Sequence, residues 1–223
     1  MHARYSILTA LLFVIASSVS AFAQATSAPG LQASEPHFSI MAIGGAVSRP
    51  PTAPVFGVEV AEQFGSHVQV YATLSYFENL MRQTLLDDLD GTGTRLATLT
   101  GDAWSFSGRD RGIGVVAGAK YVFGSGSIRP YVGGGIGNLN LKRTVSEARI
   151  GDVTQAVLND FDLGDGELVT VEGVNKPLVE LTFGVRIGSG RTHFDVGYLY
   201  RNAYRLATTL NFSQVSAGIG YRF

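Results

Sequence analysis

The sequence predicts an all-β protein, specifically an eight-stranded antiparallel up-and-down transmembrane β-barrel. Three observations predict this fold class. Bulky apolar residues alternate with small or polar ones over segments of about ten residues, which is the pattern of a strand with two different environments. Tight turns alternate with long loops along the chain, and glycine is abundant, with 28 among 223 residues. Strands of this length suit tilted spans of a bilayer, and an even strand number with short turns at one end completes the pattern.

The N-terminal segment has the pattern of a signal peptide. Arg4 precedes an apolar run at residues 7–15, and small residues then lead to an A-x-A motif that ends at Ala23. The run is shorter than the roughly 20 residues of a spanning helix, which disfavours a membrane anchor. The expected organisation is therefore a signal peptide, a flexible lead-in and an outer-membrane β-barrel domain, at residues 1–23, 24–36 and 37–223 respectively.

Eight strands follow from the alternation, and the last shows it most clearly. There, Ile219, Tyr221 and Phe223 fall on one face, whereas Gly218 and Arg222 fall on the other. The predicted strands cover residues 37–48, 54–64, 67–77, 110–123, 128–142, 177–188, 191–201 and 211–223.

The connections between these strands differ sharply in length. Short Gly-Ser turns follow the second, fourth and sixth strands, whereas residues 78–109 and 143–176 form long acidic connections after the third and fifth. All short turns therefore lie at one end of the barrel. Helical spacing predicts a short helix at residues 80–89 and another at residues 153–159, and strands that rise above the membrane are the alternative.

The bulky apolar face is predicted to meet lipid. The opposite face carries many glycines, which a water-facing surface would not need but which relieve crowding in a narrow lumen. Closure also removes edge strands, as hydrocarbon requires. Aromatic residues gather near strand ends on the apolar face, as in the girdles of membrane barrels. They are Phe38, Phe56, Phe64, Tyr76, Tyr121, Phe123, Phe194, Tyr200, Tyr221 and Phe223.

Charged residues on the inward face are expected to form a network that fills the lumen, since buried charges are costly unless they are paired. Glu59, Glu180 and Asp195 would balance Lys120, Arg186 and Arg222. The predicted lumen network consists of Glu59, Lys120, Glu180, Arg186, His193, Asp195 and Arg222, and Arg129 lies on the same face. The alternative is a gate whose pairs break to admit water or ions, but eight strands leave no open channel.

Several stretches resemble the small eight-stranded outer-membrane β-barrel family, which includes the OmpA-like transmembrane domain and the OmpX-like and opacity-type proteins. These stretches are "IRPYVGGGIGNL", "ELTFGVRIG", "HFDVGYLYR" and the terminal "SAGIGYRF". In this family the last strand carries an assembly signal, and four residues match its pattern: Ser216, Gly218, Tyr221 and Phe223. The resemblance implies an outer-membrane location and recognition by the barrel-assembly machinery.

His193, Asp195 and Ser216 share the inward face of adjacent strands and offer the residue types of a hydrolytic triad. The pair His37 and Ser39 offers another His and Ser two residues apart. Spacing of two in a strand guarantees only a shared face, so structural filling is favoured. We therefore expect no catalytic residues and no enzymatic activity.

The second long connection contains carboxylates that could bind Ca²⁺ or Mg²⁺ through oxygen. They depart from the calcium-loop pattern, so a solvated acidic loop is favoured and no metal or other cofactor is expected. These residues are Asp160, Asp162, Asp165 and Glu167.

Composition narrows the function further. The 17 Lys and Arg balance 18 Asp and Glu, which argues against a nucleic-acid partner, and the absence of Cys excludes disulfides and thiolate metal sites. The expected role is structural, in membrane integrity, or adhesion-like, through long extracellular loops. Expected partners are outer-membrane lipid and lipopolysaccharide, the assembly machinery and an extracellular ligand. The alternatives are a narrow pore for small solutes and an outer-membrane lipid-modifying enzyme.

Deletion of Phe223 is expected to impair membrane assembly more than a deletion within residues 84–100, because Phe223 ends the closing strand and completes the assembly signal. The measurement is the fraction of each variant that reaches the membrane in folded form. Equal assembly of the two variants would count against this account.

Overall fold

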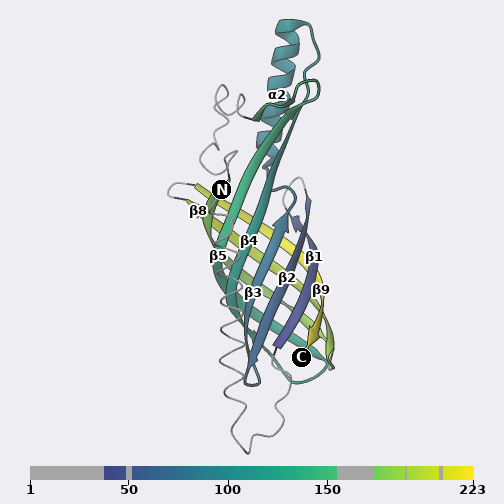
Figure 1. The fold of residues 1–223 in the computed structure, drawn as a ribbon, viewed down its shortest axis with the longest axis vertical. Coiled ribbons are helices and arrows are strands. Elements are labelled where there is room, and N and C mark those ends of the chain that lie inside the picture. Colours follow the sequence, from purple (N-terminus) through teal and green to yellow (C-terminus); the bar gives the residue numbers. More distant parts are fainter. Residues whose placement is uncertain (1–37, 49–51, 155–172, 189, 206–207) are drawn as a thin grey trace, which may run out of the picture. The chain divides into compact units, whose positions relative to one another are not determined.

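The structure, a computed structural model, describes residues 38–48, 52–154, 173–188, 190–205 and 208–223. The predicted signal peptide and lead-in lie outside these residues. Eight long antiparallel strands form a closed barrel, so the predicted fold class is confirmed (Figure 1). The long strands are β1 (Phe38–Ser48), β2 (Ala53–Phe64), β3 (Val68–Phe77), β4 (Phe106–Val122), β5 (Ile128–Glu147), β7 (Val174–Ile187), β8 (Thr192–Arg205) and β9 (Thr208–Arg222). The two-residue strand β6 (Gly151–Asp152) pairs with the end of β5.

The barrel closes where β1 meets β9. The register places Ser39 opposite Arg222 and Ser48 opposite Ser213. Beyond the last ladder position, the backbone N–H of Phe223 donates to the carbonyl of Phe38 at 2.9 Å. Because the other long strands pair with their neighbours in sequence, no long strand is left with an unpaired edge.

Tight turns join the strands at one end of the barrel. Gly65 follows β2 with a φ of 62°, and Gly124 follows β4 with a φ of 73°. These left-handed conformations favour glycine, which explains the Gly-Ser turns of the sequence. We call this end of the barrel the tight-turn end and the opposite one the long-loop end.

The alternation separates the two faces as predicted. The aromatic side chains assigned to the outer face are 38% to 61% exposed, apart from Phe38, which is half-buried beside Phe223. Aliphatic side chains such as Ile136 and Leu181 cover the surface between them. An apolar exterior around a polar interior is the reverse of the arrangement in a water-soluble barrel. No helix among the described residues is long and apolar enough to cross a bilayer.

Several predicted strands are too short at the long-loop end, among them residues 110–123 and 128–142. The predicted strands 177–188, 191–201 and 211–223 also stop short there, because β7 begins at Val174, β8 continues to Arg205 and β9 begins at Thr208. In the structure β4 begins at Phe106 and β5 continues to Glu147, and these two residues face each other at the end of the β4–β5 ladder. Figure 1 shows both strands rising past the other strands at the long-loop end. The alternation of apolar with polar residues fades there because the outward side chains beyond the apolar belt, including Arg109 and Arg111, are polar.

The first predicted helix is present but is longer than expected. It is α2 (Gln83–Thr100), not residues 80–89, and it ends at Gly101 with a φ of 74°. The second half of α2 is rich in Thr and Gly, which have low intrinsic helix propensity, but it is helical nonetheless. Four of its threonine hydroxyls each donate a hydrogen bond to the backbone carbonyl four residues earlier. These are the hydroxyls of Thr92, Thr94, Thr98 and Thr100. The second predicted helix falls almost entirely outside the described residues.

Two lumen glycines explain how the Tyr131 side chain fits in the narrow interior. A Cβ atom on Gly197 would lie 2.6 Å from the hydroxyl of Tyr131, and one on Gly184 would lie 2.5 Å from it. That hydroxyl donates to Asp195 at 2.6 Å. Glycine at the ladder partner of Tyr131 on β7 and at the next position across on β8 therefore leaves the space in which the Tyr131–Asp195 hydrogen bond forms.

The variant Gly197→Ala is expected to lower the free energy of unfolding by about 1–3 kcal/mol, because the added methyl group must displace the Tyr131 hydroxyl. Unfolding by urea in lipid vesicles would measure this loss. The matched control is Gly44→Ala on the outer face of β1, where a Cβ would meet nothing within 4 Å. A loss no larger than that of the control would contradict the account.

Candidate functional site

The lumen nearer the tight-turn end holds buried ion pairs. Nζ of Lys120 lies 2.7 Å and 2.8 Å from the two carboxylate oxygens of Glu59. The guanidinium of Arg186 approaches Asp195 at 3.3 Å, and Nε of Arg201 donates to Glu180 at 2.6 Å. All six side chains are at most 5% exposed. At this burial each charge needs its partner, since an isolated buried charge costs several kcal/mol.

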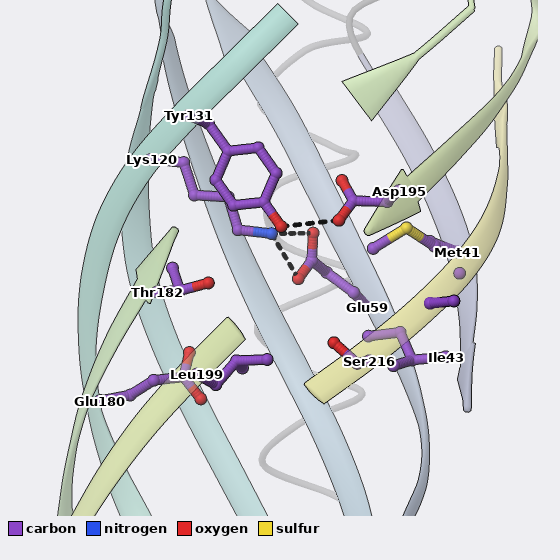
Figure 2. Close-up of a pocket in the computed structure, with 12 residues that line it drawn as sticks. Met41, Ile43, Glu59, Lys120, Tyr131, Glu180, Thr182, Asp195, Leu199 and Ser216 are labelled. Atoms are coloured by element: carbon purple, nitrogen blue, oxygen red, sulfur yellow. Dashed lines mark hydrogen bonds and ion pairs between the residues drawn. The ribbon is translucent and has the colours of Figure 1, made fainter. Parts of the chain in front are cut away.

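Two tyrosines join these pairs into one cluster. The hydroxyl of Tyr71 donates to Glu180 at 2.8 Å, as that of Tyr131 does to Asp195. Nζ of Lys120 lies 4.7 Å from the ring centre of Tyr71 and 4.9 Å from that of Tyr131, within the range of cation–π attraction. Figure 2 shows Lys120 and Glu59 reaching toward each other, with the Tyr131 hydroxyl directed at Asp195.

The space left inside this cluster is small. The cavity that these side chains line measures about 20 Å³, room for about one water molecule. The side chains, together with the backbone walls, therefore fill the lumen instead of lining an open channel.

A second, apolar layer closes the lumen toward the long-loop end. Phe77 and Phe212 meet edge to face with ring centres 5.3 Å apart, and the guanidinium carbon of Arg201 lies 5.3 Å from the Phe77 ring. Branched side chains from five strands complete the layer: Val47, Val55, Leu139, Leu141, Leu178 and Leu210. The buried cation Lys176 stands opposite Leu139 in the β5–β7 ladder, at the height of this layer.

A further ion pair lies beyond the apolar layer. Asp110 and Arg143 face each other across β4 and β5, and Nε and Nη2 of Arg143 each donate to a different oxygen of Asp110 at 2.8 Å. The backbone N–H of Leu80 donates to the Asp110 carbonyl at 2.8 Å. Past this pair, a small apolar cluster of Met81, Leu85, Leu89 and Val145 fixes α2 against the extended strands.

The structure joins some of the predicted network residues in ion pairs and places others apart from them. Glu59 pairs with Lys120 and Asp195 with Arg186, whereas the cation that contacts Glu180 is Arg201, which the predicted network did not include. Arg222 is half-buried at the tight-turn end. His193 is fully buried, and neither ring nitrogen has a hydrogen-bond partner among the described residues.

The sequence reasoning missed three members of the cluster. Arg201 and Gln214 are joined by a 2.6 Å hydrogen bond, and Tyr71 contacts Glu180. The alternation could have identified two of them, because Arg201 shares a face with His193 and Gln214 falls opposite the apolar residues of its strand. The tyrosine was harder to identify, because aromatic residues were expected only on the outer face.

The possible hydrolytic triad does not form in the described structure. Asp195 accepts from Tyr131 and Arg186, and the hydroxyl of Ser216 donates to the Gly197 carbonyl at 3.5 Å. His193 therefore contacts neither group through a hydrogen bond. Ser39 donates to the Ala61 carbonyl at 3.5 Å, and His37 lies outside the described residues.

The residues of the assembly signal divide between the two faces of β9. Ser216 and Gly218 face the lumen, whereas Tyr221 and Phe223 are 41% and 61% exposed, with ring centres 5.0 Å apart. The acidic residues from Asp160 to Glu167 lie outside the described residues. Within the described part of the chain, no group of three acidic or histidine side chains could hold a metal ion.

The closed antiparallel barrel, its apolar exterior and its filled lumen define a fold, and comparisons with known proteins agree. Neither protein-family models nor curated proteins give a match. Among solved structures, the chain is similar to Neisserial surface protein A, with 13% identity, a TM-score of 0.51, and coverage of 84% of this chain and 96% of that chain. It is also similar to the N-terminal β-barrel domain of Pseudomonas aeruginosa OprF, with 12% identity, a TM-score of 0.50, and coverage of 85% and 98% respectively. The chain thus has the fold of the small eight-stranded outer-membrane β-barrels, as the sequence motifs led us to expect.

Replacement of Arg201 by Met is expected to lower the free energy of unfolding by about 3–5 kcal/mol, because Glu180 would stay buried without its cation. The double variant Glu180→Gln/Arg201→Met should recover much of that loss. Urea unfolding in lipid vesicles, followed by circular dichroism, measures both.

The matched control is Arg109→Met, which breaks the exposed Arg109–Glu78 pair, where the nitrogen and oxygen lie 3.3 Å apart. An exposed pair contributes about 1 kcal/mol or less. If Arg201→Met costs no more than this control, the buried pair does not stabilise the barrel as described.

Proposed function

We propose that the chain is an outer-membrane barrel of a Gram-negative bacterium that serves as a structural element and presents a surface for interaction outside the cell. One observation carries this proposal: the lumen is filled, whereas the long-loop end is built into an ordered projection of β4, β5 and α2. A barrel that conducts solutes needs space in its lumen, and a barrel that displays a surface needs such a projection.

The far end of the projection has the composition of a binding surface. Leu99 is 82% exposed and Ile150 is 65% exposed. Trp104 stacks on Phe106 with ring centres 6.4 Å apart, and the guanidinium of Arg149 lies 4.6 Å from the Trp104 ring. Tryptophan and arginine are enriched among the residues that dominate protein interfaces. We call Leu99, Trp104, Arg149 and Ile150 the tip surface.

The alternatives receive less support. A pore would need the cluster around Glu59 and the apolar layer around Phe77 to rearrange together. A lipid-modifying enzyme would need a nucleophile beside a base, and the inward Ser216 and His193 share no hydrogen bond. The proposed role is therefore non-enzymatic.

The purified mature chain, reconstituted in planar bilayers, is expected to show no conductance above background, because the cavity in the lumen holds about one water molecule. Cells that display the wild-type chain should also adhere to their target surface more strongly than cells with the variant Leu99→Ser/Trp104→Ser/Ile150→Ser.

Discrete, reproducible channel openings would overturn the proposal in favour of a pore. Equal adhesion of the two cell types, at matched amounts of folded protein on the surface, would remove the interaction role and leave only the structural one.

A further inference from the structure

Two cations face each other on the outer surface at the base of the projection. Arg111 on β4 and Lys142 on β5 occupy opposite positions of the ladder, and both side chains are exposed. Like charges directly opposite on one face of a sheet destabilise it. This arrangement would be relieved by an anion that contacts both groups.

The pair lies directly beyond the apolar belt. The next outward position toward the belt on β4 is Ile113, which is 51% exposed and stands opposite Tyr76 of β3. Two residues of a strand span about 7 Å. If the belt sits in hydrocarbon, Arg111 and Lys142 lie at the depth of the lipid headgroups of the outer leaflet.

A groove adjoins the pair, away from the belt. Its volume is about 220 Å³, and it is lined by Ser107, Gly108, Arg109, Arg111, Thr144 and Ser146. Guanidinium groups and hydroxyls are donors that suit phosphate oxygens, and Arg in particular can bind phosphate through two parallel hydrogen bonds.

Carboxylates lie beside two of the three cations but not beside Arg111. The guanidinium of Arg109 contacts Glu78 at 3.3 Å, and the two side chains are 46% and 39% exposed, so solvent screens this ion pair. The hydroxyl and backbone N–H of Thr154, and more weakly the charge of Lys142, hold the pKa of Asp152 below its usual value. Among the described residues, no carboxylate lies within ion-pair distance of Arg111.

We propose that the groove lined by Arg109, Arg111 and the hydroxyls of Ser107, Thr144 and Ser146, with Lys142 beside it as the ladder partner of Arg111, binds the phosphate groups of an anionic glycolipid in the outer leaflet. This inference rests on the proposed outer-membrane location. A membrane lipid is the occupant that the position favours, because the cations adjoin the belt on the outer wall of the barrel and not the tip surface.

The test uses the full mature chain, folded in neutral detergent and titrated with lipid A that carries two phosphates, one phosphate or none. Native mass spectrometry measures the lipid retained. We expect the wild-type chain to bind the doubly phosphorylated lipid at least about tenfold more tightly than the phosphate-free lipid. The variant Arg111→Gln/Lys142→Gln should lose that preference.

The matched control is Arg95→Gln/Arg191→Gln, which removes the same net charge at exposed positions on α2 and at the tight-turn end, and it should keep the preference. Equal binding of the three lipids by the wild-type chain, or an unchanged preference in Arg111→Gln/Lys142→Gln, would overturn the inference.

Equally effective competition by inorganic phosphate or a soluble sulfated sugar would show a general anion site, which excludes a lipid as the specific occupant. Insertion into neutral phosphatidylcholine vesicles is measured separately and tests the membrane location. A chain that inserts but does not bind the phosphorylated lipid contradicts the lipid site alone, whereas a chain that does not insert contradicts the proposed location.

Discussion

The narrowness of an eight-stranded barrel is the constraint on which the rest of this structure depends. The interior is only wide enough for side chains to fill it, so a large inward side chain requires small residues beside it on the neighbouring strands. Tyr131 lies over its ladder partner Gly184 and over Gly197 on the next strand, which leave room for its ring and hydroxyl. In the same way, Tyr71 lies against Gly118 and Gly135, where an added Cβ would stand 2.8 Å and 3.0 Å from the tyrosine ring and hydroxyl. The abundance of glycine is thus a consequence of the strand number.

The same narrowness explains why the charges of the lumen occur in contact pairs. The cavity has room for about one water molecule, so water cannot hydrate an isolated carboxylate or ammonium group there. Protein groups must therefore supply the hydrogen bonds and opposite charges that water would provide. Each carboxylate of the cluster accordingly accepts from a cation and from a hydroxyl: Glu59 from Lys120 and Thr73, and Glu180 from Arg201 and Tyr71. The apolar layer around Phe77 needs no such compensation and separates this polar cluster from the long-loop end.

The membrane-spanning part could be predicted from the sequence because the bilayer imposes a strict pattern on it. Alternation identified each strand, its two faces and the tight turns, since a one-residue error would place glycine and charge in lipid. Beyond the belt this pattern is lost, and so the lengths of β4, β5 and α2 were underestimated. The pairing of Glu180 with Arg201 could not be derived either, because alternation gives the face of a residue but not its height relative to residues on other strands. That height depends on register, which emerges only when all strands are paired.

The seam between β1 and β9 has a consequence for the order of events during biogenesis. Residues at opposite ends of the barrel domain, such as Ser39 and Arg222, are direct ladder partners. Contacts this distant in sequence form slowly, because a long loop must close before the pairing can stabilise it. Until β9 is available, β1 keeps an exposed edge that another chain could occupy, and the closed cylinder cannot exist as a smaller stable intermediate. Protection of the first strand while the last is awaited is therefore a requirement of the topology itself.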